Sequence, residues 1–174
     1  MTVRVRVVLG TMGPSWEHDF WERHDFLYSS RDCPQGKWQT LQGSYPLILD
    51  KDENCTLVSM ELLLSSAYWQ VQDDLRVPLA ESGQVFVQED INDARSQAFL
   101  TNPGYTVLYT RLGAEEGERA VQHVAIAEQV VLDIDQSGTL AGVWLLDLPP
   151  EIAAARLGSS TDASAGSGCE GDID

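Results

Sequence analysis

The fold is decided by a stretch that the chain carries twice, Val130-Val-Leu-Asp-Ile-Asp-Gln-Ser-Gly-Thr-Leu140 and Leu47-Ile-Leu-Asp-Lys-Asp-Glu-Asn-Cys-Thr-Leu57. The two copies align without a gap at a spacing of 83 residues. Each consists of an apolar strand, an Asp-x-Asp turn and the start of a second strand. Further upstream, Phe26-Leu-Tyr-Ser29 matches Val107-Leu-Tyr-Thr110. The simplest explanation is an internal duplication.

The duplication predicts the organisation of the whole chain. We expect residues 1–75 to form the first unit, residues 83–158 to form the second, and residues 159–174 to be a disordered acidic tail. The fold class is α+β, predominantly β, with two tandem antiparallel β-meander units and short helices. Because the two units have matching apolar faces, we expect them to pack about a pseudo-twofold axis.

Within the second unit, alternating apolar residues predict four consecutive strands. They are Thr106–Leu112, Arg119–Ile126, Gln129–Ile134 and Leu140–Asp147. Gly138 is expected to adopt a positive φ in the turn, and Asn54 is expected to do so in the first unit. Prolines at the start and a glycine at the end predict a helix over Pro149–Gly158. Two further short helices are expected at Ser15–Arg23 and Ile91–Leu100.

The composition is that of an acidic globular protein. The chain has 174 residues, a formal net charge of −16 and 43% hydrophobic residues. So few basic residues argue against binding to nucleic acid phosphates or to an anionic membrane surface. The N-terminus lacks the continuous apolar region of a signal peptide, and the three cysteines form no CxxC pair, so we expect a reduced protein in the cytoplasm. A surface of this charge suits a basic protein partner.

The stretch from Tyr105 to Pro150 resembles the small YuzE-like domain of unknown function. The resemblance lies in a Leu-Tyr-x-Arg-Leu strand, a valine-rich strand that ends in Asp-x-Asp, a glycine turn and a further strand before a short helix. The copy over Phe26–Leu64 is weaker, with Ser59 at the place of Gly142, and Trp144 stands where that family has Glu. The resemblance implies a β-meander with a helix in a bacterial or phage protein. It implies no catalytic residue, and it suggests an antitoxin-like role.

The Asp-x-Asp turns have the composition of half a calcium loop. Asp133, Asp135 and Ser137 precede Gly138 with the alternate spacing of the first ligands of such a loop, but Trp144 occupies the position of the bidentate Glu. In the first unit Glu61 occupies that position, but the glycine is missing. Two interpretations remain open. The turn residues are ordinary hairpin formers, or Asp133, Asp135 and Ser137 bind Ca²⁺ weakly, in which case calcium is the only cofactor expected.

The segment Trp16-Glu-His-Asp-Phe-Trp-Glu-Arg-His-Asp25 is the most distinctive in composition. As a helix it would align Trp16 with Phe20, and these two residues with Trp21 would either close the core of the first unit or anchor a protein partner. His18 and His24 are six residues apart, so one helix could not present both to one metal ion.

Three functions follow from these patterns. The first is a non-enzymatic protein-interaction module with a basic partner. The alternative is a metal-binding protein or small hydrolase that uses His18, Asp19 and His24 or the Asp-x-Asp turns, although no residue is predicted to be catalytic. The third is a homodimer in which edge strands pair.

Overall fold

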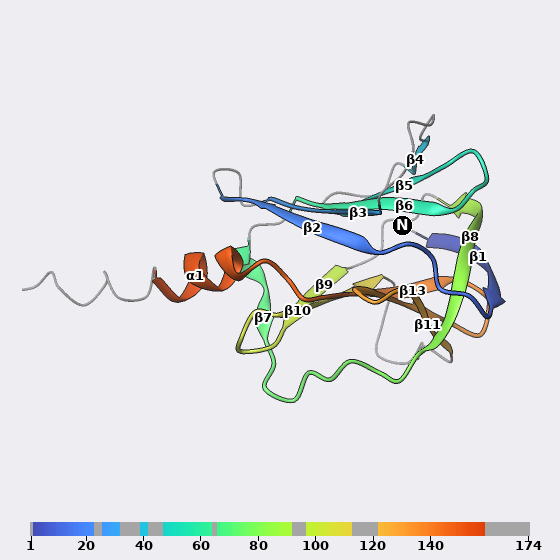
Figure 1. Cartoon of the computed structure of the whole chain (residues 1–174). Coiled ribbons are helices and arrows are strands. Elements are labelled where there is room, and N and C mark those ends of the chain that lie inside the picture. Colours follow the sequence, from blue (N-terminus) through green and yellow to red (C-terminus); the bar gives the residue numbers. More distant parts are fainter. Residues whose placement is uncertain are drawn as a thin grey trace, which may run out of the picture.

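The computed structural model describes residues 2–22, 26–31, 39–41, 47–63, 66–91, 97–112 and 122–158. The protein is mostly β, as the sequence predicts, and its strands form two sheets. In Figure 1 the sheets lie as two layers, with two long strands at one end of the molecule and a helix at the other. The predicted tail at 159–174 lies outside the described residues.

The first sheet has five strands. Its spatial order is β2 (Trp16–Trp21), β3 (Phe26–Arg31), β6 (Leu57–Leu62), β5 (Leu47–Lys51) and β4 (Gln39–Leu41). All neighbours are antiparallel.

The second sheet has eight strands, and these strands come from both of the proposed units. Its spatial order is β1 (Thr2–Leu9), β8 (Glu81–Ile91), β11 (Gln122–Ala127), β12 (Val130–Ile134), β13 (Leu140–Leu146), β10 (Val107–Leu112), β9 (Gln97–Thr101) and β7 (Gln70–Val71). β1 and β7 therefore belong to the sheet of the second unit, although both precede residue 75.

The strand order differs from a simple meander. β11, β12 and β13 form the expected consecutive hairpins, but the strand expected before them, β10, lies on the far side beside β13. The first sheet has the same arrangement, with β4, β5 and β6 in sequence and β3 beside β6. Each set of five strands thus contains a three-stranded meander. The two strands that come before this meander in the sequence lie beside its last strand in the sheet.

One predicted helix is present, a second prediction is wrong, and the third lies partly outside the described residues. The helix α1 (Pro150–Gly158) begins at a proline and buries Ile152. A short 3-10 helix, η2, spans Ser66–Tyr68. The segment predicted as a helix at Ser15–Arg23 instead contains β2, which pairs with β3 along its whole length. The prediction over Ile91–Leu100 covers the end of β8, undescribed residues and most of β9.

The two Asp-x-Asp turns have the same backbone geometry. Gly138 has a φ of 75° as predicted, but the corresponding residue of the first turn is Cys55, with a φ of 63°, and not Asn54. The Asp135 N–H donates to the Thr139 carbonyl at 2.9 Å, and the Asp52 N–H donates to the Thr56 carbonyl at the same distance. The prediction of a positive φ at Asn54 is therefore wrong by one residue.

Among the described residues, one hydrophobic core lies between the layers. Residues of the first sheet such as Leu27, Leu49 and Met60 and residues of the second such as Leu108 and Leu132 belong to one buried cluster. At one end of this core β1 and β8 pair antiparallel from Thr2 opposite Ile91 to Leu9 opposite Gly83 (Figure 1). The first and second halves of the chain consequently share one core and one sheet.

Candidate functional site

β2 separates the three aromatic residues that the sequence suggests as a cluster. A strand turns successive side chains to opposite faces, so Trp16, His18 and Phe20 point toward the core and Trp21 points outward. Trp16 is only 3% exposed and Phe20 packs against the core, whereas Trp21 is 59% exposed. Of the three predicted partner-binding residues, only Trp21 therefore presents most of its surface to solvent.

Acidic residues accompany Trp21 on the outer face of the first sheet. Glu17 and Asp19 share its face of β2, and both are exposed. Asp19 lies opposite Tyr28 of β3, which in turn lies opposite Glu61 of β6. This row across three strands, together with Trp21, is called the acidic face below.

Two carboxylates on this face lie close enough to influence each other. Burial first, and then the negative charge of Asp50, raise the pKa of Glu61 above its ordinary value. Asp50 itself is buried on β5, and one of its oxygens accepts a 2.5 Å hydrogen bond from the Ser59 hydroxyl. Ionised Glu61 is therefore held beside a buried negative charge, which is an unfavourable arrangement.

The corresponding face of the second sheet holds its buried carboxylate differently. Asp133 accepts hydrogen bonds from His123 Nδ1 at 2.7 Å and from Trp144 Nε1 at 3.1 Å. The Tyr109 ring stacks on Trp144 with 4.2 Å between centroids. Burial first, and then the charge of Asp133, raise the pKa of Tyr109 to about 12, while Arg111 opposes that change. Asp133 thus has two basic side chains, His123 and Arg111, as neighbours within its own sheet.

The strand registers show where the two faces differ. His123 lies opposite Asp133, whereas Thr40 lies opposite Asp50. Arg111 lies opposite Gly142 of β13, whereas Ser30 lies opposite Ser59 of β6. At the two places where the second sheet supplies a basic side chain, the first sheet supplies a hydroxyl.

The residues suggested for calcium serve two separate networks. Asp133 faces His123 and Trp144, whereas Asp135 Oδ1 accepts hydrogen bonds from the Ser137 N–H and hydroxyl and from the Thr139 N–H. Among the described residues, no group of three or more His, Cys, Asp or Glu side chains could hold a metal ion. These contacts favour the interpretation that the Asp-x-Asp residues form the turn, and weak binding of Ca²⁺ stays a prediction.

The residues suggested for a metal site or hydrolase are also dispersed. His18 Nε2 donates to the Leu146 carbonyl at 2.9 Å, and Nδ1 accepts from the Ser29 hydroxyl at 2.8 Å. Both ring nitrogens therefore have partners inside the fold. Asp19 points to the opposite face of β2, and His24 lies outside the described residues.

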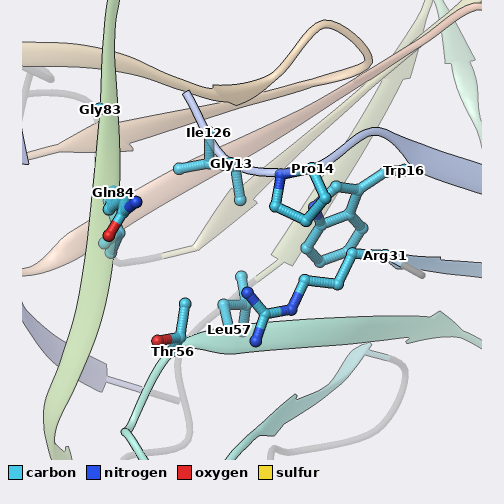
Figure 2. Close-up of a pocket in the computed structure, with 10 residues that line it drawn as sticks. Gly13, Pro14, Trp16, Arg31, Thr56, Leu57, Gly83, Gln84 and Ile126 are labelled. Carbon is cyan, nitrogen blue, oxygen red and sulfur yellow. The ribbon is translucent and has the colours of Figure 1, made fainter. Parts of the chain in front are cut away.

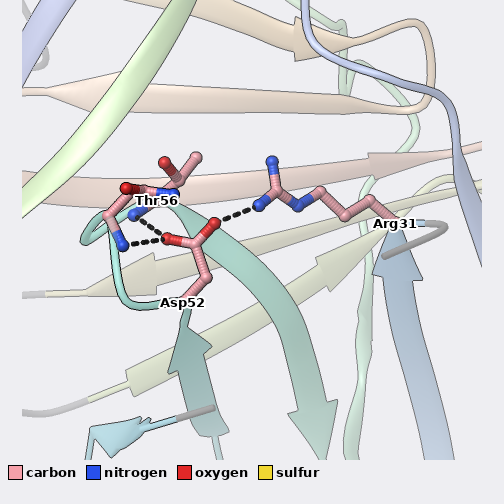
Figure 3. A network of polar contacts seen from close by, with 4 residues as sticks. Arg31, Asp52 and Thr56 are labelled. Atoms are coloured by element: carbon pink, nitrogen blue, oxygen red, sulfur yellow. Dashed lines mark hydrogen bonds and ion pairs between the residues drawn. The ribbon is translucent and has the colours of Figure 1, made fainter. Parts of the chain in front are cut away.

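A cavity between the sheets was not predicted from the sequence. It has a volume of about 80 Å³, and Figure 2 shows that Trp16, Pro14 and Arg31 line one side while Gln84 lines the other. Arg31 Nη2 contacts Asp52 Oδ2 at 2.6 Å, and Asp52 Oδ1 accepts from the N–H groups of Asn54 and Thr56 (Figure 3). No sequence motif predicts this cavity, because the residues that line it come from five separate segments of the chain.

Comparisons with known proteins assign no family to this arrangement. No protein-family model matches the chain, and a search of curated proteins found no match either. The resemblance to the YuzE-like domain therefore stays a prediction. In the described part of the chain, no helix has the length and apolar character needed to cross a membrane.

Proposed function

We propose that the protein is a non-enzymatic protein-interaction module that binds a basic protein through its acidic face. The observation that carries this proposal is the pairing of Glu61 with buried Asp50 on the same face of the first sheet as exposed Trp21. A lysine or arginine of a partner would offset the repulsion between these carboxylates. In the second sheet the buried carboxylate of Asp133 already has His123 and Arg111 nearby. It therefore does not need a basic residue of a partner in the way that Asp50 and Glu61 do.

Trp21 and the carboxylates would have different parts in binding. An exposed tryptophan supplies a large apolar contact, and such residues dominate the energy of many interfaces. Glu17 and Asp19 at the rim would increase the association rate and make it sensitive to salt. The net charge of −16 adds a long-range attraction for any basic partner. An antitoxin-like role, with a basic toxin as the partner, is the specific form that the YuzE-like resemblance implies.

We also propose that the two halves arose by duplication and are related by a pseudo-twofold axis near Val5 and Val87, which lie opposite each other. The support is a reciprocal pair of contacts. The Val5 N–H donates to the Gly138 carbonyl at 2.8 Å, and the Val87 N–H donates to the Cys55 carbonyl at 2.7 Å. The strand order of the two sets of five strands supports the same relation.

Capture experiments test the proposed function. Immobilised protein is incubated with extract of the producing cells at low and at high ionic strength, and retained proteins are identified by mass spectrometry. We expect a basic protein that is retained at low salt and released at high salt. Trp21→Ala should weaken its binding by about 2 kcal/mol, or roughly thirtyfold, and Glu61→Gln should weaken it less.

Matched controls come from residues outside the acidic face. Tyr68 and Asp74 are an exposed aromatic residue and an exposed acid elsewhere on the surface, so Tyr68→Ala and Asp74→Asn should leave capture unchanged. Retention of no basic protein, or an equal loss in the control variants, would contradict the proposal. Light scattering of the purified protein checks whether the partner is instead a second copy of the chain.

A further inference from the structure

We propose that the cavity between the sheets is a binding site for a short-chain monocarboxylate. The inference does not depend on the acidic face, because the cavity lies between the sheets whereas the acidic face is the outer side of the first sheet. Its walls combine apolar groups with three polar side chains, those of Arg31, Thr56 and Gln84. In Figure 2 the guanidinium group of Arg31 extends along the cavity toward Thr56 and Leu57.

Arg31 has hydrogen-bond donors beyond those that Asp52 uses. A guanidinium carries five N–H donors, and the Asp52 contact engages Nη2. The Nε atom is buried and has no hydrogen-bond partner in the described part of the chain. A buried donor without an acceptor is costly, so a ligand that accepts a hydrogen bond here would be favoured.

Asp52 does not use up the capacity of this arginine to bind an anion. The Asp52 carboxylate also accepts two backbone hydrogen bonds, from the Asn54 and Thr56 N–H groups, both at 2.9 Å (Figure 3). These bonds stabilise its negative charge independently of Arg31. Arg31 is held in place through Nη2, and its buried Nε–H can still donate to a second carboxylate.

The size and lining of the cavity define the ligand class. A volume of about 80 Å³ admits only a few non-hydrogen atoms. The Pro14 ring, the Trp16 indole and Ile126 form apolar walls that suit a short alkyl tail. A carboxylate with two to four carbons satisfies both requirements, with its oxygens accepting from Arg31 and from the Thr56 hydroxyl or the Gln84 amide.

Nuclear magnetic resonance of the full chain gives the direct test. Sodium propionate is added stepwise to the protein, and it replaces sodium chloride so that the ionic strength stays constant. The chemical shift of the Arg31 Nε–H resonance is followed. We expect a saturable shift with a dissociation constant on the order of 1 mM, because a ligand with so few atoms binds weakly. Acetate and butyrate should bind in the same range, whereas propionamide and inorganic phosphate should produce no saturable shift.

Variants distinguish this site from general anion binding. Arg31→Lys keeps the charge beside Asp52 but removes the Nε–H, so propionate should bind at least tenfold more weakly, as measured from the perturbed amide resonances of Thr56 and Gln84. Arg76 is an exposed arginine elsewhere, and Arg76→Lys should bind propionate as the wild type does. A flat Nε–H resonance with every carboxylate, or equal binding of propionamide or phosphate, would overturn the proposal. Either result leaves the proposed protein-interaction function untouched, since that function is tested on Trp21 and Glu61.

Discussion

His18 connects the two layers of the molecule through one side chain. It comes from β2 of the first sheet, and its Nε2–H donates to a carbonyl of β13 in the second sheet. A carbonyl oxygen can only accept, so the proton of the neutral ring is on Nε2 and Nδ1 accepts from Ser29. Burial is the largest influence, and it lowers the pKa of His18 below its ordinary value of 6.5.

This lowered pKa predicts a loss of stability in mild acid. As the pH falls through 6.5, His18 of the unfolded chain takes up a proton before the folded one does. The free energy of unfolding therefore decreases below that pH, until the folded form is protonated as well. His18→Gln keeps a donor for the Leu146 carbonyl but does not titrate. Thermal melts between pH 7.5 and 5.5 should show a smaller change in Tm for the variant; equal changes would assign the pH dependence to other groups.

Cys55 and Gly138 offer a matched pair for measuring backbone strain. Both have a positive φ in equivalent turns, but only glycine adopts it without steric cost. Cys55→Gly should raise the free energy of unfolding by up to about 1 kcal/mol, and Gly138→Ala should lower it by about 1 kcal/mol. Urea denaturation measures both. A destabilised Cys55→Gly would mean that the side chain contributes more through packing than the turn loses through strain.

At the level of elements, β2 shows why the sequence predicted part of the fold and missed another part. Trp16 and Phe20 are four residues apart, and that spacing places two residues on one face of a helix and also on one face of a strand. Only pairing with β3 decides for the strand. The turns at Asp52 and Asp135 were predictable because their hydrogen bonds are local. The Arg31 cavity was not, because distant segments form it.

Gly142 of β13 is required by the packing of a neighbouring strand. A Cβ added there would lie 2.6 Å from Tyr109 Cε2 and 2.7 Å from the Tyr109 hydroxyl. Gly142→Ala should therefore displace Tyr109 from Trp144 and lower the free energy of unfolding by about 1–3 kcal/mol. Gly104→Ala is the control, since its Cβ would meet nothing closer than 3.8 Å. Near-ultraviolet circular dichroism should report the disturbed aromatic pair in the first variant only; unchanged spectra in both would contradict this role.

On the scale of the whole molecule, the sequence predicts many of the strands but not that β1 and β7 join the sheet formed by the second half of the chain. Alternation identifies strands such as β1 and β8, but it does not say which strands are neighbours. The structure pairs β1 with β8 across the boundary of the halves and places both in one sheet. Strands that are consecutive in the sequence are usually neighbours in a sheet, so the sequence predicts β1 in the first unit and β8 in the second.

The shared core predicts that the halves remain together after the chain is cut between them. The connection from β7 to β8 is exposed, with Leu79 at 98%. A protease site inserted after Leu79 should be cleaved in the folded protein, and the two pieces should still elute together in size-exclusion chromatography. The same insertion after Val85 of β8 should prevent folding, because Val85 is buried. Separation of the pieces in native buffer would show that each half folds independently.

The pairing of β1 with β8 also has a consequence for protein synthesis. β1 is synthesised before its neighbour β8, which begins at residue 81, and the Gly138 carbonyl that accepts from Val5 comes later still. Until then Val3 and Val5 lack the paired strand and the second-sheet residues that bury them. The nascent chain therefore cannot complete its N-terminal half first, as a chain of independent domains would. β1 can therefore take its final place in the sheet only after β8 and the turn at Gly138 have been synthesised.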